Sequence, residues 1–349
     1  MKHIAPQHRR HAKDAHSVSL ACRGRYPTEA RAPPTRWFRT RPPANPPYSG
    51  RVGLAVQVEG SGESVLLDGG LATELEARGH DLSDPLWSAR LLADDPQQIV
   101  AVHAAYFRAG AAIATTASYQ ASFDGFAARG INRDGAVALL RRSVELARTA
   151  RDAAGADGRY VAASVGPYGA ALADGSEYRG HYGLSVAALT RWHRPRLEVL
   201  AGAGADVRAL ETVPDADEAE ALVTLVRSVG VPAWLSYTIE GTRTRAGQPL
   251  ADAFAVAAGV DEIVAVGVNC CAPDDVLPAI DLAGSVGKPV IVYPNSGERW
   301  DARRRAWIGP SRFSAQLASQ WAAAGVRIVG GCCRVGPANI AEMAAVLSR

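Results

Sequence analysis

Short apolar runs alternate with amphipathic stretches from about residue 60 to the end of the chain. In the stretch over 135–150, GAVALLRRSVELARTA, apolar positions recur with the period of a helix. The short runs are rich in Val, Ile and Ala, which is typical of buried strands. Eight such runs cover 64–70, 111–117, 159–166, 205–212, 232–239, 263–270, 289–296 and 326–333. Repeated strand–helix units predict an α/β fold with a parallel sheet, and eight units in roughly 290 residues match the size of a closed (β/α)8 TIM-type barrel.

An open, doubly wound sheet is the alternative architecture for the same alternation. Nucleotide-binding forms of that fold carry a glycine-rich phosphate loop after the first strand. Neither GxGxxG nor GxxxxGK[ST] follows the run over 64–70. The sequence therefore favours a single barrel domain over 61–349.

Residues 1–60 do not fit the strand–helix pattern. The first 50 residues are rich in Arg and Pro and contain ten basic and two acidic residues, which leaves 28 basic and 33 acidic residues in the rest of the chain. We expect a disordered extension over 1–60, since such a composition without apolar periodicity does not build a core. The segment has no apolar region of a secretory signal; an organelle transit peptide and a dispensable tail remain alternatives.

Charge and composition exclude several classes of protein. The remainder of the chain is mildly acidic, so no basic surface for nucleic acid is expected. No apolar run approaches the length of a membrane span. Five cysteines in 349 residues do not form a secreted disulfide framework, and they indicate a reducing, cytoplasmic environment.

The clearest chemistry lies at the ends of two predicted strands, where Cys270 ends GVNC and the pair Cys332 and Cys333 ends VGGCC. Catalytic groups of a (β/α)8 barrel lie at the carboxyl ends of its strands, so these three sulfurs should meet. Three thiolates hold one Zn²⁺ with its fourth position open, and an open position is typical of catalytic zinc. A soft site of this kind suits a thiol substrate. Cys271 should point the opposite way and is left out of the site.

Two other interpretations of the cysteines stay open. Buried free cysteines are commonly inert, and Cys332 with Cys333 would serve as a redox dithiol in a thiol–disulfide protein. The redox hypothesis leaves Cys270 without a role, and no CxxC motif is present.

Polar residues at the other strand ends suggest how an amino-acid thiol would be bound. Asp68 and Glu211 are candidates to accept hydrogen bonds from its ammonium group. Thr116 and Ser118 are candidates for its carboxylate. A helix cap, a salt bridge or a turn is the alternative role of such residues. Asn269 and Asn295 are also at strand ends, where either would orient substrate or ligands from behind.

Seven segments together resemble the homocysteine S-methyltransferase family. They are LLDGGLATELEARG with DPLWSARLL (66–92), TASYQAS (116–122), GPYGAALADGSEYRGHYGLS (166–185), the ET-P of 211–214, GVNCCAP (267–273), VYPNSGE (292–298) and IVGGCCRVGP (328–337). The resemblance implies a zinc-dependent (β/α)8 barrel in which Cys270, Cys332 and Cys333 hold the metal. It also implies homocysteine sulfur as the exchangeable ligand, with Asp68 and Glu211 near its amino group.

The resemblance is strongest to the branch that uses sulfonium methyl donors, S-methylmethionine and often S-adenosylmethionine. Four aromatic residues are candidates to hold the sulfonium by cation–π contact: Trp87, Tyr119, Tyr168 and Tyr178. The implied partners are small molecules, with no nucleic acid and no membrane, and the implied protein is a monomer or a weak oligomer without a long carboxyl-terminal arm. A selenocysteine or other thiol methyltransferase, and a barrel that binds zinc without catalysis, remain alternatives.

Overall fold

Eight parallel strands form the centre of the protein in the computed structural model, which describes residues 53, 54, 58, 60, 62–84, 86–301 and 306–348. The order of the strands is β1-β12-β9-β8-β5-β4-β3-β2. A parallel bridge between Leu67 and Ile113 joins the two outer strands, β1 and β2. The strands are β1 (Val65–Leu66), β2 (Ile113–Thr115), β3 (Tyr160–Val165), β4 (Val207–Val213), β5 (Ala233–Tyr237), β8 (Ile263–Asn269), β9 (Val290–Tyr293) and β12 (Val326–Val329). The predicted (β/α)8 barrel is confirmed, because each strand pairs with its neighbours in the chain order and the last pairs with the first.

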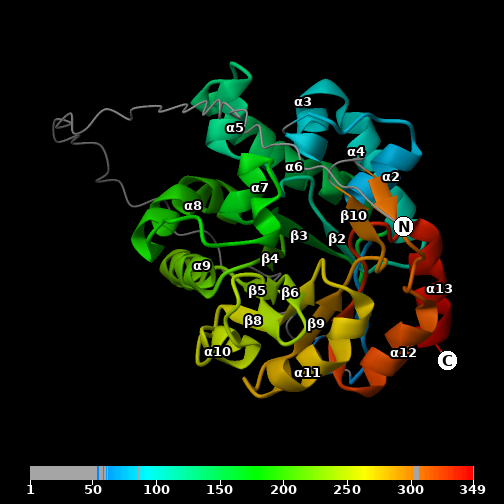
Figure 1. The fold of residues 1–349 in the computed structure, drawn as a ribbon. Helices are drawn as coiled ribbons and strands as arrows, with labels where there is room; N and C mark the ends of the chain where they lie inside the picture. The colour runs from blue at the N-terminus through cyan, green and yellow to red at the C-terminus, as the bar shows by residue number, and fades with distance from the viewer. Residues whose placement is uncertain are drawn as a thin grey trace, which may run out of the picture. The chain divides into compact units, whose positions relative to one another are not determined.

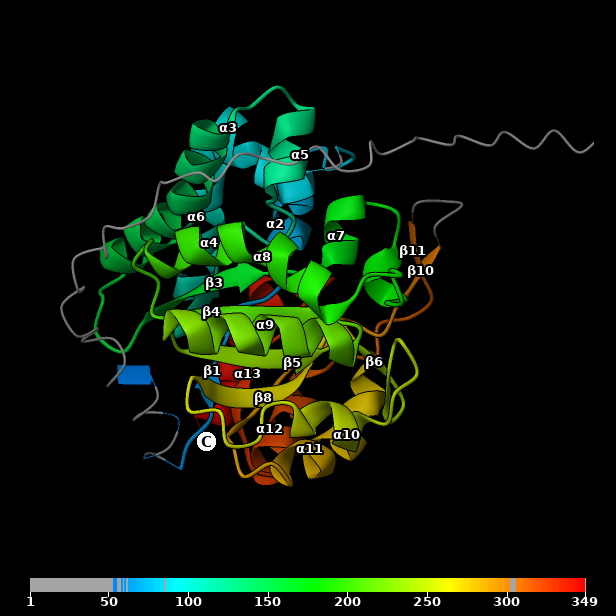
Figure 2. The same cartoon turned by 90° about the vertical axis from the view of Figure 1, so that its left-hand side faces the viewer.

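Helices surround this barrel (Figures 1 and 2). The predicted helix over 135–150 lies within α6, whose first turn is capped by the side chain of Asn132, an acceptor 2.9 Å from the amide of Gly135. The longer helices are α4 (Pro96–Arg108), α6 (Arg133–Ala153), α8 (Val186–Ala201), α9 (Ala216–Val229), α11 (Val276–Gly284), α12 (Ala315–Ala323) and α13 (Pro337–Leu347). Shorter elements occupy the loops: α2 (Leu71–Ala77), η1 (Trp87–Arg90), α3 (Leu91–Asp94), α5 (Phe123–Ala128), α7 (Tyr168–Leu172), η2 (Ser176–Tyr178), α10 (Leu250–Ala255) and η3 (Pro273–Asp275). Two hairpins complete the described elements, β6 (Ile239–Glu240) with β7 (Arg243–Thr244) and β10 (Arg299–Asp301) with β11 (Ala306–Ile308).

The strands separate two apolar cores. Side chains alternate between the two faces of a strand, so in β4 Val207 and Ala209 lie inside the barrel while Leu210 packs outward against the helices. The next inward position of β4 is Glu211, where the apolar filling of the barrel gives way to polar groups. The same change occurs at the carboxyl end of β8, which ends in the buried Asn269.

Two apolar side chains from the predicted extension belong to the interior core of the barrel. Leu54 and Val58 are both 3% exposed and cluster with Val65, Val207 and other inward-facing residues. Val58 lines the same surface pocket as Val290, which begins β9, so Val58 lies at the amino-terminal end of the barrel. The predicted boundary at residue 60 thus divides a packed segment. The rest of the extension, including its predicted disorder, lies outside the described residues.

None of the helices in the described part of the chain is long and apolar enough to cross a membrane.

His103, on α4, is fully buried, and neither of its ring nitrogens has a hydrogen-bond partner among the described residues. Burial lowers its pKa to about 4, so the imidazole is neutral in the folded protein at neutral pH. The unfolded chain binds a proton at this site from about pH 6.5 downward, and folding therefore loses free energy as the pH falls from 6.5 towards 4.

We expect His103→Leu to flatten this acid-side loss of stability. Between pH 7 and pH 4.5 the wild type should lose roughly 2 to 3 kcal/mol more of its unfolding free energy than the variant does. Urea unfolding at the two pH values measures the difference. His80→Gln, at the end of α2, is the matched control, and an equal pH dependence in wild type and His103→Leu would contradict the assignment.

Candidate metal and substrate site

The three predicted metal ligands come together at the carboxyl end of the barrel. Cys270 directly follows β8, and Cys332 with Cys333 follows β12. Their sulfur atoms all lie within 4.8 Å of one another. Cys271 packs instead into the outer core, as its position beside Cys270 predicts.

Two of these sulfurs are bonded to each other in this structure. The disulfide joins Cys270 to Cys332, and the sulfur of Cys333 lies 4.0 Å from that of Cys332. A metal bound by all three residues needs them as thiolates, so metal binding requires the disulfide to be reduced. The pairing differs from the expected redox dithiol, which joins Cys332 to Cys333.

The segment over 293–296, which follows β9, holds the two cysteine-bearing loops together through its backbone. The amide of Cys270 donates to the carbonyl of Tyr293 over 3.3 Å, and the amide of Cys332 donates to the carbonyl of Pro294 over 2.8 Å. The two loops are 62 residues apart in sequence but share this one neighbour.

The same segment also reaches Cys333, because the amide of Ser296 donates to the Cys333 carbonyl over 3.0 Å. On the opposite side of this loop, Gly330 of GGCC allows the chain after β12 to approach the chain after β1 closely. A Cβ atom on Gly330 would lie 2.8 Å from the carbonyl oxygen of Asp68, so a larger residue would push the two strands apart.

Three residues at the strand ends adopt positive φ angles although they are not glycine: Thr212 at 56°, Cys270 at 49° and Arg334 at 67°. Such conformations cost of order 1–3 kcal/mol each and persist where the surrounding contacts enforce them. For Thr212 the contact is the side chain of Asn269, which accepts from the Thr212 amide at 2.7 Å and donates to its hydroxyl at 2.8 Å.

Asp68 is 2% exposed at the end of β1. It accepts hydrogen bonds from the amide and the hydroxyl of Thr115, at 2.7 and 3.0 Å. Burial raises the pKa of Asp68 well above its usual value despite these bonds, and the charge of Glu211 adds to the increase.

Glu211 is 7% exposed and faces the same interior. Its carboxylate accepts from the hydroxyls of Ser164 and Tyr293, the latter at 3.1 Å. Burial raises the pKa of Glu211 to about 7, since these two bonds offset only part of the desolvation. No cationic side chain among the described residues forms an ion pair with Asp68 or Glu211. The pair therefore forms an electrostatically unbalanced pocket that suits a positively charged group.

The hydroxyls of Thr116 and Ser118 lie just behind this pocket. Ser118 donates to the carbonyl of Ser164 over 2.8 Å, the two hydroxyls are 2.8 Å apart, and Thr116 accepts from the Ser164 amide at 3.0 Å. Both hydroxyl protons are thus donated within the chain, and the two residues brace Ser164, which in turn donates to Glu211. Their expected contact with a substrate carboxylate stays a prediction.

The two predicted asparagines have different places. Asn269 is fully buried and holds the backbone of Thr212, which follows Glu211, and its expected role in orienting substrate or ligands stays a prediction. Asn295 accepts from the amide of Gly297 at 2.8 Å, and its own amide donates to Cys271. It is therefore a turn residue of the segment between the cysteine loops.

Three of the four candidate aromatic residues gather beside the site. The rings of Trp87 and Tyr119 meet edge to face with centroids 6.5 Å apart, and the Tyr119 hydroxyl contacts Thr212. The hydroxyl of Tyr178 contacts Cys333; burial raises the pKa of that thiol to about 11, and this hydrogen bond partly opposes the increase. Tyr168 instead packs against Trp192, with centroids 5.0 Å apart.

A fully buried charged network that the sequence did not reveal fixes the backbone beneath these aromatics. Arg196, on α8, donates to the carbonyl of Gly166 at 2.5 Å and to that of Tyr119 at 3.4 Å. It also contacts His193, whose other ring nitrogen lies 2.8 Å from Glu218. The loops that follow β2 and β3 are thereby tied to one helix.

Comparison with known proteins identifies the family. The family model for homocysteine S-methyltransferase matches residues 65–347. The chain belongs to the homocysteine S-methyltransferase family. It is 50% identical over 292 residues to the homocysteine S-methyltransferase of Escherichia coli, covering 80% of this chain and 94% of that protein. It is 42% identical over 304 residues to the selenocysteine Se-methyltransferase of Brassica oleracea var. italica, covering 80% and 88% respectively.

Solved structures of a homocysteine methyltransferase share the fold. The metallated form of MmuM from Escherichia coli has a TM-score of 0.73 at 46% identity, covering 81% of this chain and 96% of that one. The oxidized form of the same enzyme also has a TM-score of 0.73, at 47% identity and the same coverage. The expected family and enzyme class are therefore confirmed for this methyltransferase.

The raised pKa of Glu211 makes a prediction for the ligand-free methyltransferase. The folded protein binds a proton at Glu211 more tightly than the unfolded chain does, so folding loses free energy as the pH rises from about 4.5 through about 7. We expect Glu211→Gln to raise the unfolding free energy at pH 8.5 by up to about 3 kcal/mol and to have little effect at pH 4.5. Denaturant titration measures this, with the exposed Glu220→Gln on α9 as control. A variant that is less stable than wild type at pH 8.5 would contradict the unbalanced pocket.

Proposed function

We propose that this protein transfers a methyl group from a sulfonium donor, S-methylmethionine or S-adenosylmethionine, to the thiol of homocysteine to give methionine. The observation that carries the proposal is that three cysteine sulfurs and two buried carboxylates, which form no ion pair with any described cationic side chain, lie at the same end of the barrel. A thiol that also carries an ammonium group is complementary to both parts. Zinc, homocysteine as acceptor and a sulfonium as donor are proposed together because each accounts for a different part of the site.

Cys270, Cys332 and Cys333 would hold the metal. Three sulfur ligands within 4.8 Å of one another match the soft donor set that Zn²⁺ accepts, with a fourth position left for a substrate. When bound, zinc would lower the pKa of the substrate thiol, so that the sulfur is a nucleophilic thiolate at neutral pH. A reducing compartment such as the cytoplasm would keep the Cys270–Cys332 disulfide open.

Asp68 and Glu211 would receive the ammonium group of homocysteine. Both carboxylates are already held in place, one by Thr115 and the other by Ser164 and Tyr293, so they lose little freedom when the substrate binds. A cation between them favours their charged forms and lowers both pKa values. Binding of homocysteine would therefore release protons from this pair near neutral pH.

The aromatic residues would hold the methyl donor. A sulfonium above the rings of Trp87, Tyr119 and Tyr178 would be attracted by their negative faces. In the reaction the homocysteine thiolate forms a new bond to the methyl carbon, and the electron pair of the broken bond returns to the donor sulfur, which becomes a neutral thioether. Opposite charges are neutralised, so a site with little water favours the reaction.

Two alternatives differ in acceptor or in class. A selenocysteine acceptor would use the same sulfur cluster and carboxylates, and a relative with that activity is 42% identical. A thiol–disulfide protein is favoured only by the Cys270–Cys332 bond. That hypothesis gives no role to the unbalanced carboxylates. The small-molecule partners and a monomeric or weakly associating state remain part of the proposal.

The first experiment measures zinc content and methyl transfer on freshly reduced protein. We expect about one zinc per chain, and methionine formation from homocysteine with S-methylmethionine or S-adenosylmethionine but not with betaine. Cys332→Ala should lose the zinc and at least 1,000-fold of the turnover, on the order of what loss of an essential reactive group costs. Full turnover by a zinc-free Cys332→Ala protein would reject the mechanism. Selenocysteine offered in competition decides the acceptor.

Removing one carboxylate of the pocket should affect homocysteine more than the donor. We expect Glu211→Gln to raise the KM for homocysteine at pH 8 by about 10- to 100-fold, corresponding to the loss of one charge-assisted hydrogen bond of roughly 1.5–3 kcal/mol. Zinc content and the KM for the donor should change little. Steady-state kinetics with each substrate varied in turn test this, and an unchanged KM for homocysteine would remove Glu211 from the ammonium site.

A further inference from the structure

The loop that carries Cys332 and Cys333 is fixed at one end by a charged side-chain contact that the proposed reaction does not use. Arg334 directly follows Cys333, and its guanidinium donates to the carboxylate of Glu298 at 3.0 and 3.4 Å. Glu298 ends the VYPNSGE motif and immediately precedes β10. Its side chain is 13% exposed, against 43% for the side chain of Arg334. The contact therefore joins two loops that lie next to each other at the metal-binding end of the barrel.

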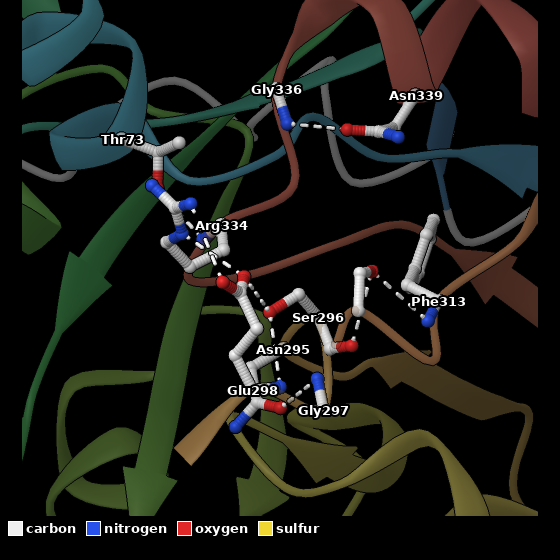
Figure 3. Close-up of polar contacts among 10 residues, drawn as sticks. Thr73, Asn295, Ser296, Gly297, Glu298, Phe313, Arg334, Gly336 and Asn339 are labelled. Carbon is white, nitrogen blue, oxygen red and sulfur yellow. Dashed lines mark hydrogen bonds and ion pairs between the residues drawn. The ribbon is translucent and has the colours of Figure 1, made fainter. Parts of the chain in front are cut away.

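Ser296 connects this ion pair to the cysteine backbone. Its hydroxyl donates to Glu298 at 2.8 Å and its amide donates to the carbonyl of Cys333 at 3.0 Å. Figure 3 shows Glu298 between the Arg334 guanidinium and Ser296. Arg334, Glu298, Ser296 and Cys333 thus form a closed ring of contacts, which we call the Arg334 clamp.

The backbone of Arg334 has an unfavourable conformation that the contacts of the clamp hold in place. Its φ of 67° lies in the left-handed region, which is unfavourable for a residue with a side chain. The Arg334 amide donates to the hydroxyl of Thr73 on α2 at 2.8 Å, and the guanidinium is held on the other side by Glu298. The two contacts together fix a turn that would otherwise relax, and this turn sets the direction in which the preceding Cys333 projects.

We propose that Glu298 and Arg334 are positioning residues for the metal ligands, acting through Cys333 and Cys332 to hold the sulfurs in the arrangement that binds Zn²⁺. The inference rests on the proposed zinc site. A partly exposed ion pair contributes little to global stability, with a typical value of about 0–1 kcal/mol. The clamp should therefore affect metal affinity far more than folding, since residues that orient metal ligands commonly change affinity by about 10- to 100-fold when mutated.

The test measures zinc affinity of the reduced full-length protein by competition with a chromogenic chelator, without any turnover. Glu298→Gln removes the charge and keeps the shape. Arg334→Gly removes the guanidinium while relieving the backbone strain, so a loss of affinity in this variant comes from the clamp and not from added strain. We expect each to raise the zinc Kd about 10- to 100-fold, and the double variant to be no weaker than the weaker single variant because the two residues act as one unit.

Asp274→Asn is the matched control. It breaks the 2.9 Å ion pair between Asp274 and Arg312, which is more exposed than the pair of Glu298 with Arg334. Arg312 is a suitable comparison because its backbone amide also donates to the same segment, at the carbonyl of Ser296. We expect its zinc Kd to stay within about twofold of wild type. Thermal melts check that all variants are folded. Zinc Kd values within twofold of wild type for both Glu298→Gln and Arg334→Gly would overturn the proposal, as would losses that multiply in the double variant.

A second readout separates this proposal from the zinc hypothesis itself. In reduced, metal-free protein the clamp limits movement of Cys333, so its loss should increase the rate of thiol modification by an aromatic disulfide reagent several-fold. If wild type binds no zinc, the proposed function fails, and the modification rate still decides whether the clamp fixes the cysteine loop. Equal rates in wild type and Glu298→Gln would show that it does not.

Discussion

The backbone of residues 293–296 is the constraint on which the site depends. One short segment after β9 accepts a hydrogen bond from Cys270, accepts another from Cys332 and donates one to Cys333, so it determines how far apart the three sulfurs lie. These bonds use main-chain atoms, which makes the spacing a property of the strand order β12-β9-β8 rather than of particular side chains. The parallel barrel thus brings distant cysteines together because β9 lies between the two strands that carry them.

The interior of the barrel changes from apolar to polar along its axis. Below the site the inward positions are apolar, whereas at the carboxyl end they are Ser164, Glu211, Ser236, Asn269 and Tyr293. Hydrogen bonds connect these side chains to one another, and no cationic side chain in the described part of the chain pairs with the carboxylates of Glu211 and Asp68. A buried pair of this kind is a cost in the free protein and an attraction for an ammonium group. Trp87, Tyr119 and Tyr178 lie in loops at this end of the barrel, and Arg196 on α8 holds the loops that follow β2 and β3.

The sequence predicted the barrel and the three cysteines because both depend on local signals, namely apolar periodicity and thiols placed at strand ends. It pointed to Asp68, Glu211 and Asn269 at strand ends, but it did not predict the hydrogen bonds that hold these side chains in place. Thr116 and Ser118 are at a strand end as expected, but their hydroxyls are used to brace Ser164, and this depends on the packing of β2 against β3. The contact of Glu298 with Arg334 and that of Arg196 with Gly166 span 36 and 30 residues in sequence, so no local pattern predicts them. The boundary at residue 60 could not be refined from the sequence, because the short run RVGLAVQVEG over 51–60 adjoins the Arg- and Pro-rich stretch, and the core residues that Leu54 and Val58 pack with lie far along the chain.

The packing of Leu54 and Val58 determines where the chain can be shortened without opening the barrel. These residues pack at the end of the barrel opposite to the cysteines, where they separate its apolar interior from solvent. A version of the protein that starts at residue 61 would lack Leu54 and Val58. Water would then gain access to the apolar layers of the barrel beneath Glu211. A version that starts just before Gly53 would keep both residues. The amino-terminal limit of the barrel domain is thus set by Leu54 and Val58, which close one end of the barrel, and not by the first strand.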